Sequence, residues 1–125
     1  MISKPSPWKE CVLDYNRSAT EFTGDDVDRF TALVDLGRPF SGVQVFVPTI
    51  DSGAVSVYIQ RDNNIDTVPV IVHYRQTSDN ATAAMSTTAS TGGYVFEFPV
   101  SGIQCFRLYT GANQTADRTF YVRGV

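Results

Sequence analysis

Apolar and polar residues alternate with a period of two along most of the chain, the pattern of a strand that buries one face. Segment 54–60 shows it most clearly, with inward positions Val55, Val57 and Ile59 and outward positions Ser56, Tyr58 and Gln60. About eight segments of this kind predict strands: 8–14, 29–37, 43–48, 54–60, 67–74, 92–100, 103–109 and 117–125. No stretch holds a 3.6-residue apolar period, so the pattern predicts an all-β chain.

The alternation also predicts which side chains point inward. Expected inward positions are Phe30, Ala32, Val34 and Leu36, then Tyr94, Phe96 and Phe98, and finally Phe120 and Val122. Tyr121 and Arg123 alternate with the last pair and are expected to point outward. Segments 43–48 and 103–109 are apolar at nearly every position, which predicts strands buried on both faces.

Turn residues separate these segments, among them Gly53, Gly102 and Gly111. Pro69 lies inside 67–74 and predicts an edge position or a bulge there, since proline cannot donate to a strand ladder. The pattern predicts a two-sheet antiparallel sandwich, jelly-roll-like. The expected organisation is an extended arm at 1–8 and a single domain at 9–125. Residues 76–93, rich in Ser, Thr and Ala, are expected to form a long loop that could hide a short strand near 84–88.

Composition narrows the classes of partner. The chain has 125 residues, the size of one domain, of which 42% are apolar and 18% charged. The net charge is −3 and no cluster of lysine and arginine occurs, which argues against a nucleic-acid partner. No run approaches the ~20 apolar residues of a membrane helix, and no apolar run near Met1 indicates a secretory leader.

Two cysteines occur, Cys11 and Cys105, both in apolar segments. Two residues do not make a disulfide framework, and a chain without a leader is expected in a reducing cytoplasm. Free buried thiols are the first interpretation. A Cys11–Cys105 bridge stays open as the alternative, because strands near the two ends of a sandwich often pair.

Few residues could carry catalysis. The one histidine, His73, has no nucleophile motif beside it, and one His with two distant Cys is too few for a zinc site. The acidic segments 25–28 and 62–66 could suit calcium, but neither has the spacing of an EF-hand loop, and ordinary turns explain both. We therefore expect no enzyme activity, no metal and no cofactor.

Several residues are better suited to contact a partner. Trp8, Tyr58 and Tyr121 could form a sugar-stacking platform, or could pack under loops or against another subunit. Arginine is enriched at the energetic centres of interfaces, and Arg107 and Arg123 lie in apolar strands near the end of the chain. Met85 lies in the 76–93 loop. The candidate interface residues are Trp8, Tyr58, Met85, Arg107, Tyr121 and Arg123.

Three segments carry a resemblance to a known class of proteins. They are DLGRPFSGVQVFVPTIDS (35–52), VSVYIQRD (55–62) and FRLYTGANQTADRTFYVRG (106–124). Across 33–125 the chain resembles small β-sandwich virion proteins of tailed bacteriophages.

The resemblance implies a structural role in the particle and no catalytic residues. The leading expectation is a capsid decoration (cement) protein, a homo-oligomer such as a trimer, bound to the major capsid protein in a virion assembled in the host cytoplasm. A neck, tail or baseplate component is the alternative within the particle. A carbohydrate-binding module for host attachment is the alternative of another class.

Overall fold

The computed structural model describes residues 5–17, 26–62, 64, 67–76 and 81–125. Within them lie one short 3-10 helix, η1 (Val27–Arg29), and ten strands. The first five strands are β1 (Lys9–Leu13), β2 (Val34–Phe40), β3 (Val43–Val47), β4 (Val55–Ile59) and β5 (Val70–Ile71). The other five are β6 (His73–Arg75), β7 (Thr82–Ala84), β8 (Tyr94–Phe98), β9 (Ile103–Thr110) and β10 (Arg118–Gly124).

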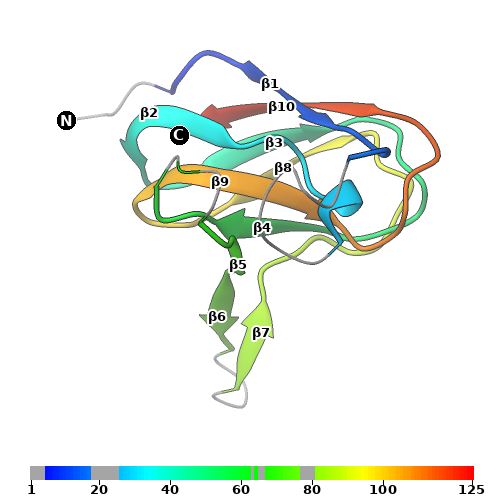
Figure 1. The fold of residues 1–125 in the computed structure, drawn as a ribbon. Coiled ribbons are helices and arrows are strands. Elements are labelled where there is room, and N and C mark those ends of the chain that lie inside the picture. Colours follow the sequence, from blue (N-terminus) through cyan, green and yellow to red (C-terminus); the bar gives the residue numbers. More distant parts are fainter. Residues whose placement is uncertain (1–4, 18–25, 63, 65–66, 77–80) are drawn as a thin grey trace.

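Eight of the strands form two four-stranded antiparallel sheets, in the orders β1-β10-β3-β8 and β2-β9-β4-β5 (Figure 1). Their pairings are nested: β1 pairs with β10, β2 with β9, β3 with β8 and β4 with β5. This is the pairing of a long hairpin rolled over on itself, the jelly roll. The predicted all-β sandwich is confirmed, and two strands more than the expected eight make up a separate hairpin.

The space between the sheets holds one apolar core. Val43, Val45 and Val47 are fully buried from one sheet, and Val55 and Val57 from the other. Phe98, Phe106 and Phe120 are also fully buried and fill the largest volumes between the layers. The inward positions predicted on β4, β8 and β10 therefore face the core, as the period of two requires.

One edge of the sandwich is closed by backbone pairing between the sheets. Leu13 at the end of β1 lies opposite Thr31, and the Ala32 N–H donates to the Val12 carbonyl at 2.9 Å. The Thr31 N–H donates to the Leu108 carbonyl at 2.9 Å. The short segment before β2 thus joins both sheets and covers strand edges that would otherwise be open.

Several predicted faces were wrong. Ala32 is exposed, because the backbone before β2 turns to make the pairing just described. β3 is not buried on both faces, since Phe46 is 44% exposed on its outer side. Ser56 and Gln60 were expected to face outward, but both are buried: Ser56 pairs with Ser86, and Gln60 bonds to Arg107 and to the Asn64 carbonyl.

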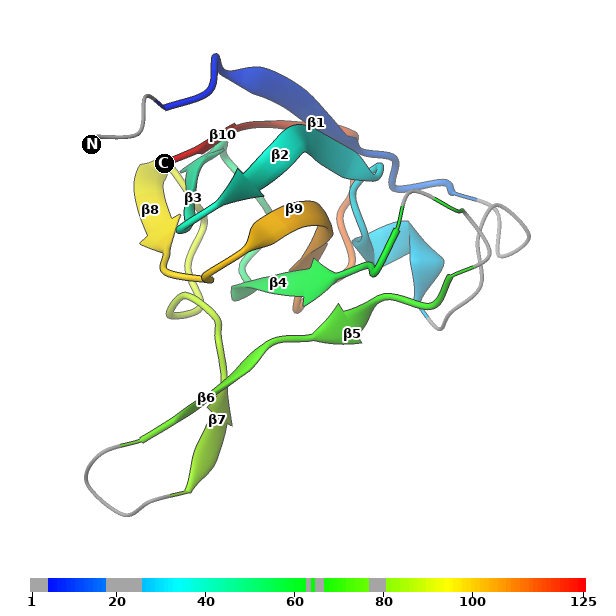
Figure 2. The same cartoon turned by 90° about the vertical axis from the view of Figure 1, so that its left-hand side faces the viewer.

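The 67–93 region departs most from the prediction. The single strand expected at 67–74 is divided into β5 and β6, with Pro69 directly before the edge strand β5, so the edge position predicted for it is confirmed. The division falls at Val72, whose N–H donates to the Val57 carbonyl at 3.1 Å and whose carbonyl accepts from the Met85 N–H at 2.8 Å. Beyond Val72 the chain leaves the sandwich as the β6–β7 hairpin, which Figures 1 and 2 show extending away from both sheets.

None of the helical residues that the structure describes forms a helix long and apolar enough to cross a membrane.

Gly92 and Gly93 offer a test of the packing next to β8. Both have positive φ, 83° and 81°, which costs an alanine about 1–2 kcal/mol. A Cβ at Gly92 would also clash with the Pro48 carbonyl, whereas a Cβ at Gly93 would meet open space. We expect Gly92→Ala to lower the free energy of unfolding by about 1–3 kcal/mol more than Gly93→Ala. Urea denaturation measures this, and equal losses would contradict the contact between Gly92 and Pro48.

Candidate functional site

The outer face of sheet β1-β10-β3-β8 carries a group of exposed aromatic side chains. Tyr121 on β10 lies opposite Phe46 on β3, and Phe46 lies opposite Val95 on β8. These three side chains form one apolar row across the sheet. They are 39%, 44% and 53% exposed, respectively. Large side chains with this much exposure in one contiguous row usually mark a binding surface.

Trp8, directly before β1, completes this surface. Trp8, Phe46 and Tyr121 surround a hollow of about 290 Å³, which we call the aromatic cup. The Phe46 and Tyr121 rings meet edge to face, with centroids 6.1 Å apart and planes at 79°. Trp8 is 42% exposed, so all three rings remain open to solvent on one side.

Trp8 is held in place by two sets of contacts. Its ring lies over the Arg123 guanidinium, whose central carbon is 4.5 Å from the ring centroid, a cation–π contact. Two residues before Trp8, the Ser6 N–H donates to the Gly124 carbonyl at 2.9 Å, and Ser6 Oγ accepts from the Gly124 N–H at 2.7 Å. Residues 5–8 of the predicted arm are therefore fixed along β10, while residues 1–4 lie outside the described residues.

A row of polar side chains borders the aromatic cup. Arg123 Nε donates to Gln44 Oε1 at 2.8 Å, and Gln44 Nε2 donates to Glu97 Oε1 at 3.0 Å. The three residues lie side by side on β10, β3 and β8. We call them the polar row. Because each side chain orients the next, the cup is bordered by hydrogen-bonding groups with set directions.

The structure brings together three of the six predicted interface residues, Trp8, Tyr121 and Arg123. Sequence reasoning missed Phe46, which lines the cup with them. The signal was present, because Gln44 and Phe46 are out of phase with Val43, Val45 and Val47. Because four of these five side chains are apolar, the alternation of inward and outward positions does not show as an alternation of apolar and polar residues.

Tyr58 lies on the other sheet and does not join the sugar platform predicted with Trp8 and Tyr121. Its ring packs edge to face against Phe30, with centroids 4.8 Å apart, and lies 5.2 Å from the ring of Tyr109. Burial raises the pKa of the Tyr58 hydroxyl above its usual value. In this cluster on the outside of β4 and β9, Phe30 is buried and both tyrosines are partly buried.

Arg107 is buried as well, with 3% exposure. Its Nε donates to Gln60 Oε1 at 3.1 Å and one terminal nitrogen donates to the Thr31 carbonyl at 3.0 Å. Burial, and then the charge of Arg17, lower its pKa to about 10. In the folded chain Arg107 joins two of its own segments, and its burial leaves little of the side chain for contact with a partner.

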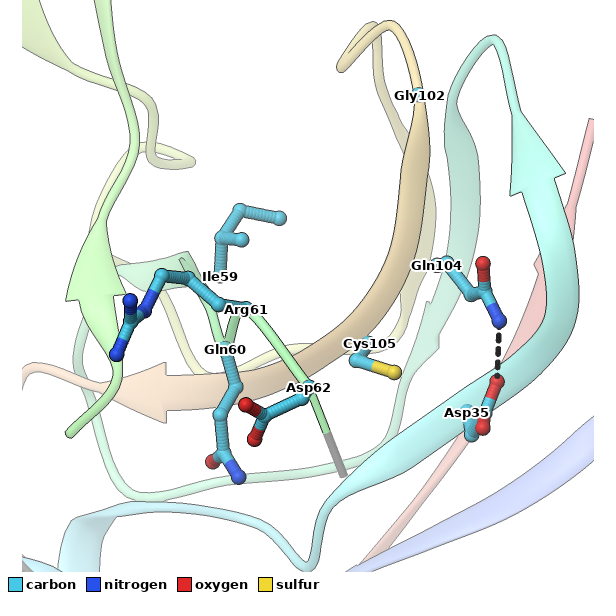
Figure 3. Close-up of a pocket in the computed structure, with 8 residues that line it drawn as sticks. All are labelled: Asp35, Ile59, Gln60, Arg61, Asp62, Gly102, Gln104 and Cys105. Atoms are coloured by element: carbon cyan, nitrogen blue, oxygen red, sulfur yellow. Dashed lines mark hydrogen bonds between the residues drawn. The ribbon is translucent and has the colours of Figure 1, made fainter. Parts of the chain in front are cut away.

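A second hollow, about 410 Å³, lies on the outer side of sheet β2-β9-β4-β5 (Figure 3). Its polar lining includes Asp35, Asp62, Gln60, Gln104 and Cys105, with Asp62 and Asp35 on opposite sides of Cys105 in the view of Figure 3.

Both carboxylates in this pocket are held ionised. The pKa of Asp35 is lowered by the Gly37 N–H, at 2.8 Å, and then by the Gln104 amide, at 3.2 Å. The pKa of Asp62 is lowered by the Thr67 hydroxyl, at 2.7 Å, and then by the Asn64 N–H. A general acid at neutral pH needs a raised carboxyl pKa. These two carboxylates have the opposite shift and serve to stabilise turns.

Cys11 and Cys105 are free thiols in different surroundings, so the alternative of a Cys11–Cys105 disulfide is not what the structure shows. Cys11 lies in the core, donates to the Ala32 carbonyl at 3.6 Å, and has its pKa raised to about 12 by burial. Cys105 lines the polar pocket, where burial and then the nearby Asp35 raise its pKa. Neither environment favours the thiolate that nucleophilic catalysis requires.

The other candidate ligands lie apart. His73 is exposed on β6, and the described residues contain no group of three His, Cys, Asp or Glu side chains that could hold a metal ion. Of the two acidic segments considered for calcium, Asp25, Asn63 and Asp66 lie outside the described residues. Met85 lies at the base of the hairpin, beside Tyr74 and Phe96.

Comparison with known proteins gives a likeness of fold. No protein-family model matches the chain, and no curated protein matches it. The crystal structure of the SPBc2 prophage-derived protein YomS is similar, with a TM-score of 0.50 and 15% sequence identity. The likeness covers 99% of this chain and 96% of that one, so it reaches beyond 33–125 to most of the first 32 residues. At this identity it shows a shared sandwich.

The thiol environments predict slow alkylation. Because the thiolate is the reactive form and both pKa values are raised, the native protein at pH 8 should react with iodoacetamide far more slowly than free cysteine. Cys11 should be slower than Cys105, since it is also buried. Mass spectrometry of tryptic peptides measures this, with the urea-unfolded chain as the control. Rapid labelling of Cys11 in the native protein would contradict its place in the core.

Proposed function

We propose that the chain is a non-enzymatic structural protein of a phage particle, that it decorates the capsid, and that it attaches through the β6–β7 hairpin. The observation that carries this proposal is the hairpin itself, which leaves the sandwich and makes its strand pairs only with itself (Figure 2). The jelly roll is a recurrent architecture of viral shell proteins, and the neighbour of similar fold comes from a prophage.

The hairpin has few contacts to hold it in isolation. His73, Tyr74 and Arg75 on β6 are exposed, and the three residue pairs of β6 and β7 are joined only to each other. A two-stranded hairpin alone is marginally stable in water, so a surface that packs against it would order it. A partner protein in a particle supplies such a surface.

The base of the hairpin also has an apolar hollow of about 240 Å³. Its lining includes Tyr74 and Met85 from the hairpin side and Phe96 and Pro99 from the sandwich. An apolar side chain of the capsid protein would fill this hollow and bury Tyr74, which is 45% exposed. Aromatic residues in such positions contribute a large share of interface energy.

Several copies of the hairpin, binding the shell at the same time, would strengthen an attachment that is weak for one copy. A homo-oligomer such as a trimer would place several hairpins on one shell, and avidity multiplies the affinity of each without a new contact.

A neck, tail or baseplate position is the alternative, and the number of copies per particle separates the two. Quantitative mass spectrometry of purified particles should find hundreds of copies for a decoration protein and few for a tail ring.

Attachment can be tested by adding purified protein to particles assembled without it and sedimenting the mixture. We expect the wild type to co-sediment and Tyr74→Ala to bind about tenfold more weakly, as for one central aromatic contact. Phe46→Ala is the matched control and should bind as the wild type does, since Phe46 is 44% exposed but lines the aromatic cup and not the hollow at the base of the hairpin.

Two results would count against the proposal. If the wild type stays in the supernatant, the chain does not bind the shell. If Phe46→Ala loses binding and Tyr74→Ala keeps it, attachment runs through the aromatic cup and the hairpin is not the contact.

A further inference from the structure

We infer that the aromatic cup, formed by Trp8, Phe46 and Tyr121, is a carbohydrate-binding site that takes a neutral pyranose ring. This inference goes beyond the structural role proposed above and uses a different surface. The hairpin extends from the side of the molecule opposite β1 in both views (Figures 1 and 2). A chain attached by its hairpin would therefore present the Trp8 end of β1 away from the shell.

The shape and lining of the aromatic cup suit one sugar ring. A pyranose has an apolar face of C–H bonds, and the faces of aromatic rings carry the negative charge that attracts them. Three rings surround the hollow, and its volume of about 290 Å³ is close to the lower limit of about 300 Å³ for small-ligand sites.

The polar row supplies the second element of sugar recognition. Ring hydroxyls lie around the edge of a pyranose, where they need donors and acceptors with fixed directions. Gln44 and Glu97 are joined by a hydrogen bond of 3.0 Å, and Gln44 also holds Arg123 at 2.8 Å. Amide, carboxylate and guanidinium groups can each make further hydrogen bonds while keeping these. An apolar wall with a few oriented polar groups is the arrangement expected for a small polar ligand.

Charge indicates a neutral sugar. Glu97 ends the polar row, and Glu10 lies opposite Tyr121 on the same face. The positive charge of Arg123 is stacked under Trp8 and directed toward Gln44. An anionic sugar would meet two carboxylates near the cup, so uncharged hexoses and N-acetylhexosamines are the matching class.

The cup is also pre-organised. Trp8 is fixed by Arg123 and by the pairing of Ser6 with Gly124, and the Phe46 and Tyr121 rings stand on adjacent paired strands. Rings already held in the bound geometry lose little freedom when a ligand stacks on them, which favours binding.

The test uses the fluorescence of Trp8, the chain's single tryptophan, so that a change in emission reports on the cup alone. Purified protein is titrated with cellohexaose, N-acetylchitohexaose and maltohexaose, and isothermal calorimetry measures the same titrations. We expect a saturable change in Trp8 emission with at least one of the three. Phe46→Ala should weaken that binding about tenfold, and Phe46→Tyr, which keeps the ring, should retain it.

Tyr74→Ala is the control variant, because it removes a side chain as exposed as Phe46 from the hairpin and should leave sugar binding unchanged. Circular dichroism and thermal melting establish that each variant is folded. Since isolated protein is used, this result is independent of particle binding.

Three outcomes would overturn the inference. The first is no change in emission or heat with any of the three oligosaccharides. The second is binding that Phe46→Ala leaves intact. The third is a shift of Trp8 emission that follows protein concentration without sugar, which would mean that the cup is a contact between copies of the chain.

Discussion

The packing of inward-facing side chains between the two sheets is the constraint on which the rest of the molecule depends. Phe98, Phe106 and Phe120 are fully buried there, together with the alternate valines of β3 and β4. In a strand the side-chain period is two, so a register slip of one residue would turn every core side chain outward. The core therefore also decides which residues face out. Phe46, Tyr121 and Arg123 meet on one surface because Val45 and Val122, beside them in sequence, are held inside.

The two outer faces then have different roles. On sheet β2-β9-β4-β5, Phe30 packs on Tyr58 and Tyr109, and Arg107 joins Gln60 to Thr31. These contacts are internal and leave a polar pocket whose carboxylates accept turn hydrogen bonds. On sheet β1-β10-β3-β8 the rings of Trp8, Phe46 and Tyr121 stay 42%, 44% and 39% exposed, each with one side open to solvent. Aromatic surface remains exposed where the fold does not bury its own side chains.

Buried Arg107 shows how tertiary structure reassigns a residue type. An arginine in an apolar strand suggests an interface residue, because arginine is enriched at the energetic centres of interfaces. A buried guanidinium must find acceptors, and here Gln60 and the Thr31 carbonyl supply two of them. The short segment before β2 carries Thr31 and also closes the edge between the sheets. Arg107 thus contributes to the same closure that covers the strand edge.

The sequence by itself determined the all-β class, the sandwich and most inward positions of β4, β8 and β10, because the alternation of apolar and polar residues is a local property of each strand. The outward positions of Tyr121 and Arg123 could be predicted for the same reason. Only the tertiary structure decided that Phe46 stays exposed, that Tyr58 and Arg107 are covered, and that β6 and β7 form a separate hairpin. Each of these depends on which distant segment lies over a strand, such as Phe30 over Tyr58 or Met85 beside Val72. A period along the chain shows the two faces of a strand, but the contacts that cover a face come from residues far away in the sequence.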